Sequence, residues 1–157
     1  MAGTIESRLA ELGVTLPETG TGPKAAGNYL PFVVSGNLVF VSGQISQTPD
    51  GLITGKLGSD LDIAAGAEAA KHCAIALLTQ VKTACDGDLD RLVRAVKLTG
   101  FVNSTPDFPD QPKVINGASD FLVAALGDAG RHARAAVSAG SLPMNVAVEI
   151  EGIFEIK

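Results

Sequence analysis

The C-terminal segment, residues 145–156 (NVAVEIEGIFEI), constrains the fold more than any other part of the chain. Apolar and polar side chains alternate along it, which is the period of a β-strand. One face would carry the apolar side chains of Val146, Val148, Ile150, Phe154 and Ile156, and the other face would carry Ala147, Glu149, Glu151 and Glu155. This pattern predicts a strand in a sheet that packs on helices with one face and presents a polar second face.

The rest of the chain predicts the elements around this strand. Helices are expected at residues 4–13, 61–85 and 112–126, and further strands at 30–34, 38–43, 91–103 and 132–139. Thr4 is the expected N-cap of the first helix, and Ser35-Gly36-Asn37 suits a tight hairpin turn. Residues 47–59 are glycine-rich and predict a loop long enough to cover a cleft.

The order of hairpin, helix, strand, helix and two strands predicts an α+β domain. Both long helices would lie on one face of an antiparallel or mixed sheet. No further helix remains in the sequence to cover the opposite face. We therefore expect identical subunits to associate through their sheets.

Composition and charge restrict the kinds of molecule that this protein can bind. A chain of 157 residues fits one domain, and the net charge of −5 repels phosphate backbones and anionic membrane surfaces. Cys73 and Cys85 lie on one predicted helix, too far apart to form a disulfide, and the N-terminal residues lack the apolar run of a signal peptide. We expect a cytoplasmic protein with no nucleic-acid and no membrane partner.

Two charged residues stand inside apolar strands. Arg134 lies in HARAAVSA and Glu149 in NVAVEIEG, and each either forms a structural ion pair, lies on a solvated strand face or contacts a ligand. His72 and His132 stand alone, and such residues are more often structural than catalytic. No P-loop, no serine-hydrolase elbow and no metal-binding motif is present in the sequence.

Five short segments, taken together, resemble the RidA (YjgF) family. They occur in the family's order and near its spacing: N-Y29, V-S-G-Q at 41–44, V-I-N116, A-R134-A-A-V, and L-P143 followed by V-E149-I-E151. The resemblance covers residues 24–157, which would form a RidA-like domain, and residues 1–23 resemble an N-terminal helical extension found in one branch of the family. It implies a chorismate-mutase-like fold and a homotrimer with the sheets facing inward.

The resemblance also implies an activity. Family members hydrolyse reactive 2-imino and enamine acids to 2-oxo acids and ammonia in a cleft between subunits, and the reaction needs no cofactor and no metal. Arg134 matches the arginine whose planar guanidinium holds the substrate carboxylate. Glu149 matches the glutamate that positions or activates the attacking water.

Other positions match residues that line the family's cleft, namely Tyr29, Ser42, Gly43 and Asn116. The amide of Gly43 and the side chain of Asn116 are the expected hydrogen-bond donors. Ala136 stands where the family usually has a cysteine, and its backbone carbonyl can still contact the substrate nitrogen. The family's Gly-Pro-Tyr is Gly27-Asn28-Tyr29 here, which relaxes the local φ constraint.

These departures leave a second reading open. It is a non-catalytic trimer with a regulatory role, whose cleft binds a small carboxylate and in which Arg134 is only an anion clamp. An endoribonuclease, a name often attached to this family, is disfavoured by the net negative charge and by the lack of basic or aromatic stripes.

Overall fold

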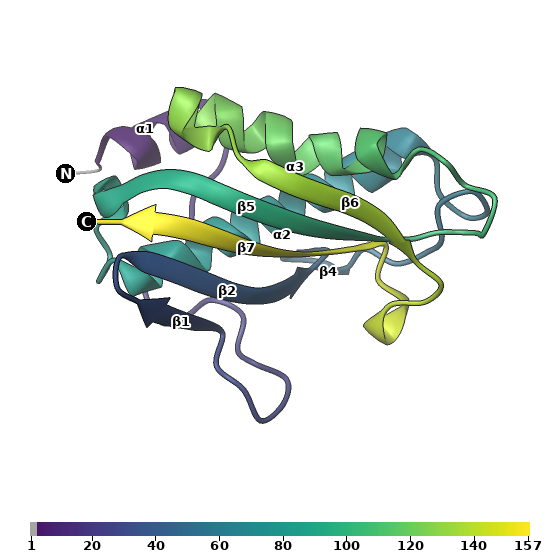
Figure 1. Ribbon diagram of the computed structural model, residues 1–157, viewed down its shortest axis with the longest axis horizontal. Coiled ribbons are helices and arrows are strands. Elements are labelled where there is room, and N and C mark those ends of the chain that lie inside the picture. Colours follow the sequence, from purple (N-terminus) through teal and green to yellow (C-terminus); the bar gives the residue numbers. More distant parts are fainter. Residues whose placement is uncertain (1–2) are drawn as a thin grey trace.

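The computed structural model describes residues 3–157, which form a mixed five-stranded sheet with its helices on one side. Figure 1 shows α2 behind the strands and α3 along the β6 side of the sheet, with α1 and the C-terminal end of β7 near the same edge of the molecule. The sheet strands are β1 (Phe32–Ser35), β2 (Leu38–Ile45), β5 (Leu92–Asn103), β6 (Ala133–Ala139) and β7 (Val148–Ile156), and the α-helices are α1 (Thr4–Glu11), α2 (Ile63–Ala84) and α3 (Gln111–Leu126). The expected α+β fold is confirmed.

The strand order is β1-β2-β7-β5-β6, which places the C-terminal strand in the centre of the sheet. The β1–β2 hairpin turns at Gly36, whose φ of 62° lies in the left-handed region that glycine adopts without strain. β7 pairs antiparallel with β2 and β5, whereas β5 and β6 run parallel. A parallel pair needs a crossover, and α3 supplies it.

The core lies between the sheet and the pair α2 and α3. Val148, Ile150 and Phe154 are fully buried, as the alternation along the C-terminal segment predicts. Ala147 is an exception, because it was expected on the polar face and is fully buried. The reason is that a 3₁₀ turn, η3 (Pro143–Asn145), precedes β7, so Ala147 lies outside the strand, with its amide donating to the carbonyl of Ile53 at 2.9 Å.

The segment expected to be a loop at residues 47–59 is more ordered than the sequence indicates. It contains a small hairpin of β3 (Gln47–Thr48) and β4 (Gly51–Leu52). Leu57 is fully buried and donates its amide to the carbonyl of Asn103 at 2.8 Å, and the Asn103 side chain donates to the carbonyl of Gly55 at 3.2 Å. One buried leucine and one buried asparagine therefore hold this segment against the end of β5.

The first helix is capped by a residue that the sequence did not indicate. Thr4 was expected as the N-cap, but it is the first residue of α1, and the carboxylate of Asp90 accepts hydrogen bonds from the amides of Thr4 (2.8 Å) and Ile5 (3.0 Å). Asp90 belongs to the 3₁₀ turn η1 (Leu89–Arg91), which is distant in sequence. A carboxylate at a helix N-terminus satisfies free amides and favours the helix dipole.

Several element boundaries also differ by a few residues from the sequence-based expectation. β1 spans Phe32–Ser35 rather than residues 30–34, and α2 begins at Ile63 because the side chain of Asp62 accepts from the amide of Ala65 at 2.8 Å. Among residues 3–157, no helix has both the length and the apolar character needed to cross a bilayer.

The contact between α2 and α3 generates a test of the fold. A Cβ atom at Gly117 would run into the backbone of Ala67 on α2, so Gly117→Ala is expected to force the helices apart and to lower the free energy of unfolding by about 1–3 kcal/mol. Urea denaturation measures this change. Gly140→Ala, where a Cβ would meet nothing within 4 Å, is the control, and equal stability of the two variants would contradict the close approach.

Candidate functional site

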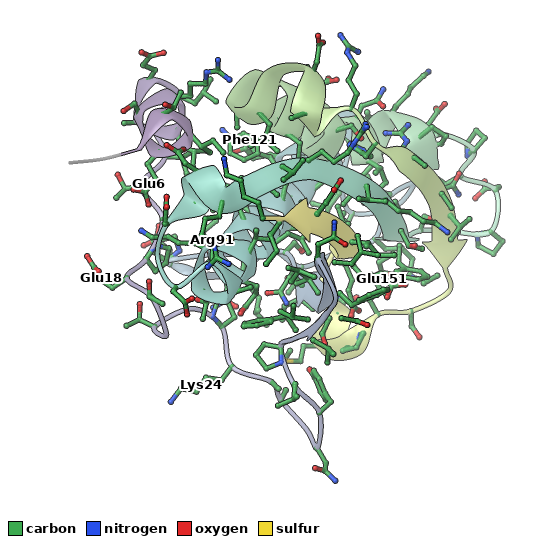
Figure 2. The ribbon with its side chains drawn as sticks, turned by 60° about the vertical axis from the view of Figure 1, so that its left-hand side comes forward. Glu6, Glu18, Lys24, Arg91, Phe121 and Glu151 are labelled. Carbon is green, nitrogen blue, oxygen red and sulfur yellow. The ribbon has the colours of Figure 1, made fainter. Side chains whose placement is uncertain are left out.

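A cavity of about 760 Å³ lies beside β2, α2 and the linker that joins α1 to β1. In Figure 1 the linker descends below β1, and in Figure 2 Lys24 on this linker points away from the sheet. Of the predicted site residues, those that line the cavity are Tyr29, Ser42, Gly43 and Glu149. The cavity thus gathers residues from three parts of the sequence, one on the linker, two on β2 and one on β7.

A β-bulge shapes the β2 wall of this cavity. The register between β2 and β7 shifts between Val41 and Gln44, so Ser42 and Gly43 are left out of the ladder. The hydroxyl of Ser42 donates to the carbonyl of Leu30 at 2.6 Å, which ties the bulge to the linker. A side chain at Gly43 would collide with the Glu149 carboxylate, so only glycine lets that carboxylate lie over the β2 backbone.

Glu149 has the properties of a proton acceptor. Its pKa is raised, first because burial disfavours the charged form and second because of the negative charge of Glu151. Within residues 3–157, the side chain of Glu149 forms no ion pair, so no cation offsets these two effects. A half-buried carboxylate with a raised pKa that faces a cavity is a candidate general base.

Sequence reasoning missed several residues of the cavity wall. His72 of α2, which pairs with Glu68 at 3.4 Å, and Met144 both line the cavity. Met144 and Asn145 have φ values of 55° and 57°, a backbone that is uncommon for methionine and that asparagine adopts more readily. The Asn103 side chain donates to the Asn145 side chain at 3.1 Å. The sequence carries no signal for this turn beyond Pro143.

The N-terminal helix α1 contributes no residue to the cavity lining. α1 packs instead on α3 and η1. The linker after it forms the wall, with Pro17, Gly22 and Pro23 among the lining residues.

Arg134 lies elsewhere, on the edge strand β6 and on the side of the helices. Its Nη1 donates to the hydroxyl of Ser119 at 2.9 Å, and its Nη2 donates to the carbonyl of Pro112 at 3.2 Å, both on α3. Among residues 3–157, no carboxylate forms an ion pair with Arg134, so the structural ion pair considered from the sequence is absent from this part of the chain. The guanidinium is anchored on neutral oxygens and its charge stays uncompensated.

Asn116 and Ala136 belong to the surroundings of Arg134. Asn116 is exposed on α3, one helical turn beyond Pro112. Ala136 is two residues beyond Arg134 on β6, pairs with Gly100 of β5 and packs against the core.

Within one chain the seven predicted residues therefore form two groups. Tyr29, Ser42, Gly43 and Glu149 line the cavity, whereas the lining includes none of Arg134, Asn116 and Ala136. β5 lies between β6 and β7, and Glu149 alternates with the buried Val148 and Ile150, so it is on the face opposite the helices. A single chain does not bring the arginine and the glutamate together.

The sheet face opposite the helices is partly apolar and bare in the single chain. Phe40 pairs with Val33 on one side and with Ile153 on the other, which makes a row across three strands, and Phe40 and Val33 are 42% and 50% exposed. Val137 on β6 is 45% exposed. Figure 2 labels Glu151, a residue of β7, among the side chains of the sheet. The sequence-based expectation of a sheet face without helical cover is confirmed.

The two cysteine thiols are poorly suited to act as nucleophiles. Cys73 and Cys85 are both buried, and burial raises the pKa of each thiol, with the charge of Glu149 adding to the rise at Cys73. In the part of the chain that the structure describes, no three side chains of His, Cys, Asp or Glu lie close enough together to share a metal ion.

Comparison with known proteins places this chain and its fold in one family. The chain is 41% identical to protein TCP17 of Trypanosoma cruzi over 99% of this chain and 96% of that protein. It is 49% identical, with a TM-score of 0.89, to a protein of unknown function from Agrobacterium tumefaciens, over 98% of this chain and 93% of that one. A "putative endoribonuclease" from Shewanella oneidensis is 33% identical, with a TM-score of 0.90, over 98% and 100% of the two chains.

The model of a protein family described as "YjgF/chorismate mutase-like, putative endoribonuclease" matches residues 6–155, nearly the whole chain. The similarity of the whole fold to the solved structures agrees with that match. The chain therefore belongs to the YjgF/RidA family and has its chorismate-mutase-like fold.

Proposed function

We propose that this protein hydrolyses reactive 2-imino acids and their enamine tautomers to 2-oxo acids and ammonia. The observation that carries the proposal is the pair of unmatched charges. Arg134 presents a guanidinium with no carboxylate partner among residues 3–157, and Glu149 presents a half-buried carboxylate with a raised pKa beside a cavity. An anion clamp and a general base are the two groups that this hydrolysis needs.

In the proposed reaction the guanidinium of Arg134 holds the substrate carboxylate through parallel N–H bonds. Glu149 takes a proton from a water molecule as the water oxygen attacks the carbon of the protonated imine. The product of attack is a tetrahedral carbinolamine. Glu149 returns its proton to the nitrogen, the C–N bond breaks and ammonia leaves. The hydroxyl loses its own proton to Glu149 as the C–O bond becomes the carbonyl of the 2-oxo acid, and that proton passes to solvent, so neither a metal nor a cofactor is required.

The remaining predicted residues have supporting roles in this proposal. Tyr29 and Ser42 line the cleft, and the amide of Gly43 and the side chain of Asn116 donate hydrogen bonds to the substrate. The carbonyl of Ala136 contacts the substrate nitrogen. The E. coli relative TdcF, 25% identical with a TM-score of 0.59, has a structure with bound serine, a small molecule that carries both a carboxylate and an amine.

The site is proposed to form between two subunits of a homotrimer whose sheets face inward. The separation of Arg134 from Glu149 in one chain supports this, because a neighbouring subunit can supply the missing partner. The bare row of Val33, Phe40 and Ile153 supplies apolar surface for such an association. We further propose a cytoplasmic location, in keeping with two unpaired cysteines, and no nucleic-acid or membrane partner, in keeping with the net charge of −5.

One observation favours the alternative of a non-catalytic carboxylate-binding trimer. Ala136 puts a methyl group against the core where the family usually has a thiol. In that case Arg134 binds an anion and no turnover follows.

The clamp role of Arg134 gives the first functional prediction. Arg134→Ala is expected to reduce the release of ammonia from freshly generated 2-aminoacrylate at least a hundredfold, because a charged, bidentate contact to the substrate is lost. Ammonia release at matched protein concentration measures it, with the exposed Arg8→Ala as the control. A wild-type rate no higher than buffer would contradict the deaminase and favour the binding role.

The shared site gives a second prediction. Arg134→Ala and Glu149→Gln are each expected to be inactive, but refolding them together in equal amounts restores activity at about one quarter of the sites, where each subunit supplies its intact residue. Ammonia release from the mixture measures it, and each variant refolded alone is the control. No recovery from mixed oligomers would show that both residues act within one chain.

The raised pKa of Glu149 gives a third prediction. A general base works when it is deprotonated, so activity falls as the pH drops through the Glu149 pKa, at a higher pH than for an ordinary glutamate. Glu151→Gln removes one cause of the raised pKa and is expected to move this acid limb to lower pH. Glu155→Gln, farther along the same face, is the control. An acid limb unmoved by Glu151→Gln would show that another group controls it.

A further inference from the structure

Arg134 is the first member of a chain of hydrogen bonds that runs from the edge strand through α3 to the turn before β6. Its Nη1 donates to the Ser119 hydroxyl at 2.9 Å, and that hydroxyl lies 2.9 Å from Nε2 of His132. Nδ1 of His132 lies 2.6 Å from the carbonyl of Gly130. Of the residues joined by these hydrogen bonds, only Arg134 has a part in the proposed reaction.

The donors in this chain can be assigned from the groups present. The carbonyl of Gly130 can only accept, so Nδ1 of His132 carries the proton and donates to it. Nε2 of the neutral ring is then an acceptor, and it takes the hydrogen of the Ser119 hydroxyl. The hydroxyl oxygen is left free to accept from Arg134. All three bonds point in one direction, from the guanidinium to the backbone carbonyl.

The neutral form of His132 is favoured by its surroundings. The pKa of His132 is lowered, mainly by burial and also by the positive charge of Arg134, while the bond to the carbonyl of Gly130 opposes the change. A charged ring would point a second N–H at the Ser119 hydroxyl and leave the hydrogen of that hydroxyl without an acceptor. The arrangement therefore requires the neutral ring that its environment favours.

We propose that Ser119 and His132 are positioning residues that hold the guanidinium of Arg134 in the orientation that receives the substrate carboxylate. This inference rests on the proposed role of Arg134 as the carboxylate clamp. Two of the five N–H groups of the guanidinium are used by Ser119 and by the carbonyl of Pro112, which leaves three for a ligand.

A support of this kind matters because of where Arg134 lies. It is on β6, the edge strand, and its side chain is half-buried, so the strand alone does not fix a long side chain with several rotatable bonds. The bonds to Ser119 and Pro112 come from one rigid helix, at positions about two turns apart. A guanidinium ordered before binding loses less conformational freedom when the ligand arrives.

The test compares the affinity for pyruvate, a stable 2-oxo acid, with the rate of imine hydrolysis. Ser119→Ala is expected to weaken pyruvate binding, measured by calorimetry, about tenfold, because it removes the anchor on a charged donor. Ser119→Thr keeps a hydroxyl and is expected to restore most of the affinity. His132→Phe keeps a ring of similar size without an acceptor and is expected to resemble Ser119→Ala.

Two readouts separate positioning from a general loss of structure. The acid limb of the pH profile, which reports on Glu149 in the other part of the site, is expected to stay unchanged in Ser119→Ala and His132→Phe. Ser7→Ala, an exposed serine on α1, is the matched control and is expected to bind pyruvate like the wild type.

Different experimental results would contradict the positioning role and the proposed hydrolysis. A wild type that hydrolyses the imine, together with Ser119→Ala and His132→Phe variants that bind pyruvate equally well, would overturn the positioning role and leave the deaminase intact. A moved acid limb in both variants would also overturn it, because the effect would then be structural. A wild type that neither hydrolyses the imine nor binds pyruvate would overturn the proposed function and this inference with it.

Discussion

The burial of one face of β7 against α2 and α3 is the constraint on which the rest of the structure depends. Val148, Ile150 and Phe154 are fully buried, and because successive side chains point to opposite faces, Glu149 and Glu151 are placed on the other side of the sheet. β7 is also the central strand, bonded to β2 and β5. The packing that stabilises the core thus also fixes the position of the candidate base.

The environment of Glu149 follows from its neighbours. The bulge in β2 takes Ser42 and Gly43 out of the ladder, and the missing side chain at Gly43 makes room for the carboxylate. Glu151 lies two residues away on the same face, so its charge adds to the effect of burial on the Glu149 pKa. Burying a carboxylate without a cation costs free energy, and such a cost is common where a group has a function.

Arg134 and Glu149 are separated by the architecture of the sheet. One is on the helix side of the edge strand, and the other is on the bare side of the central strand. No rearrangement of side chains within a five-stranded sheet would bring them into contact. Assembly of identical subunits is therefore as much a part of the proposed function as the two residues, and the apolar row on the bare face gives assembly a physical basis.

Periodicity and turn chemistry, which are local, were sufficient to predict the alternation of β7, the hairpin turn at Gly36 and the two long helices. The family motifs were also visible in the sequence. The sequence alone did not reveal that Asp90 caps α1, that Leu57 and Asn103 hold residues 47–59 in place, or that Ser119 and His132 support Arg134. Only the tertiary structure decided these, because each joins residues that are separated along the chain and meet only when the helices pack on the sheet.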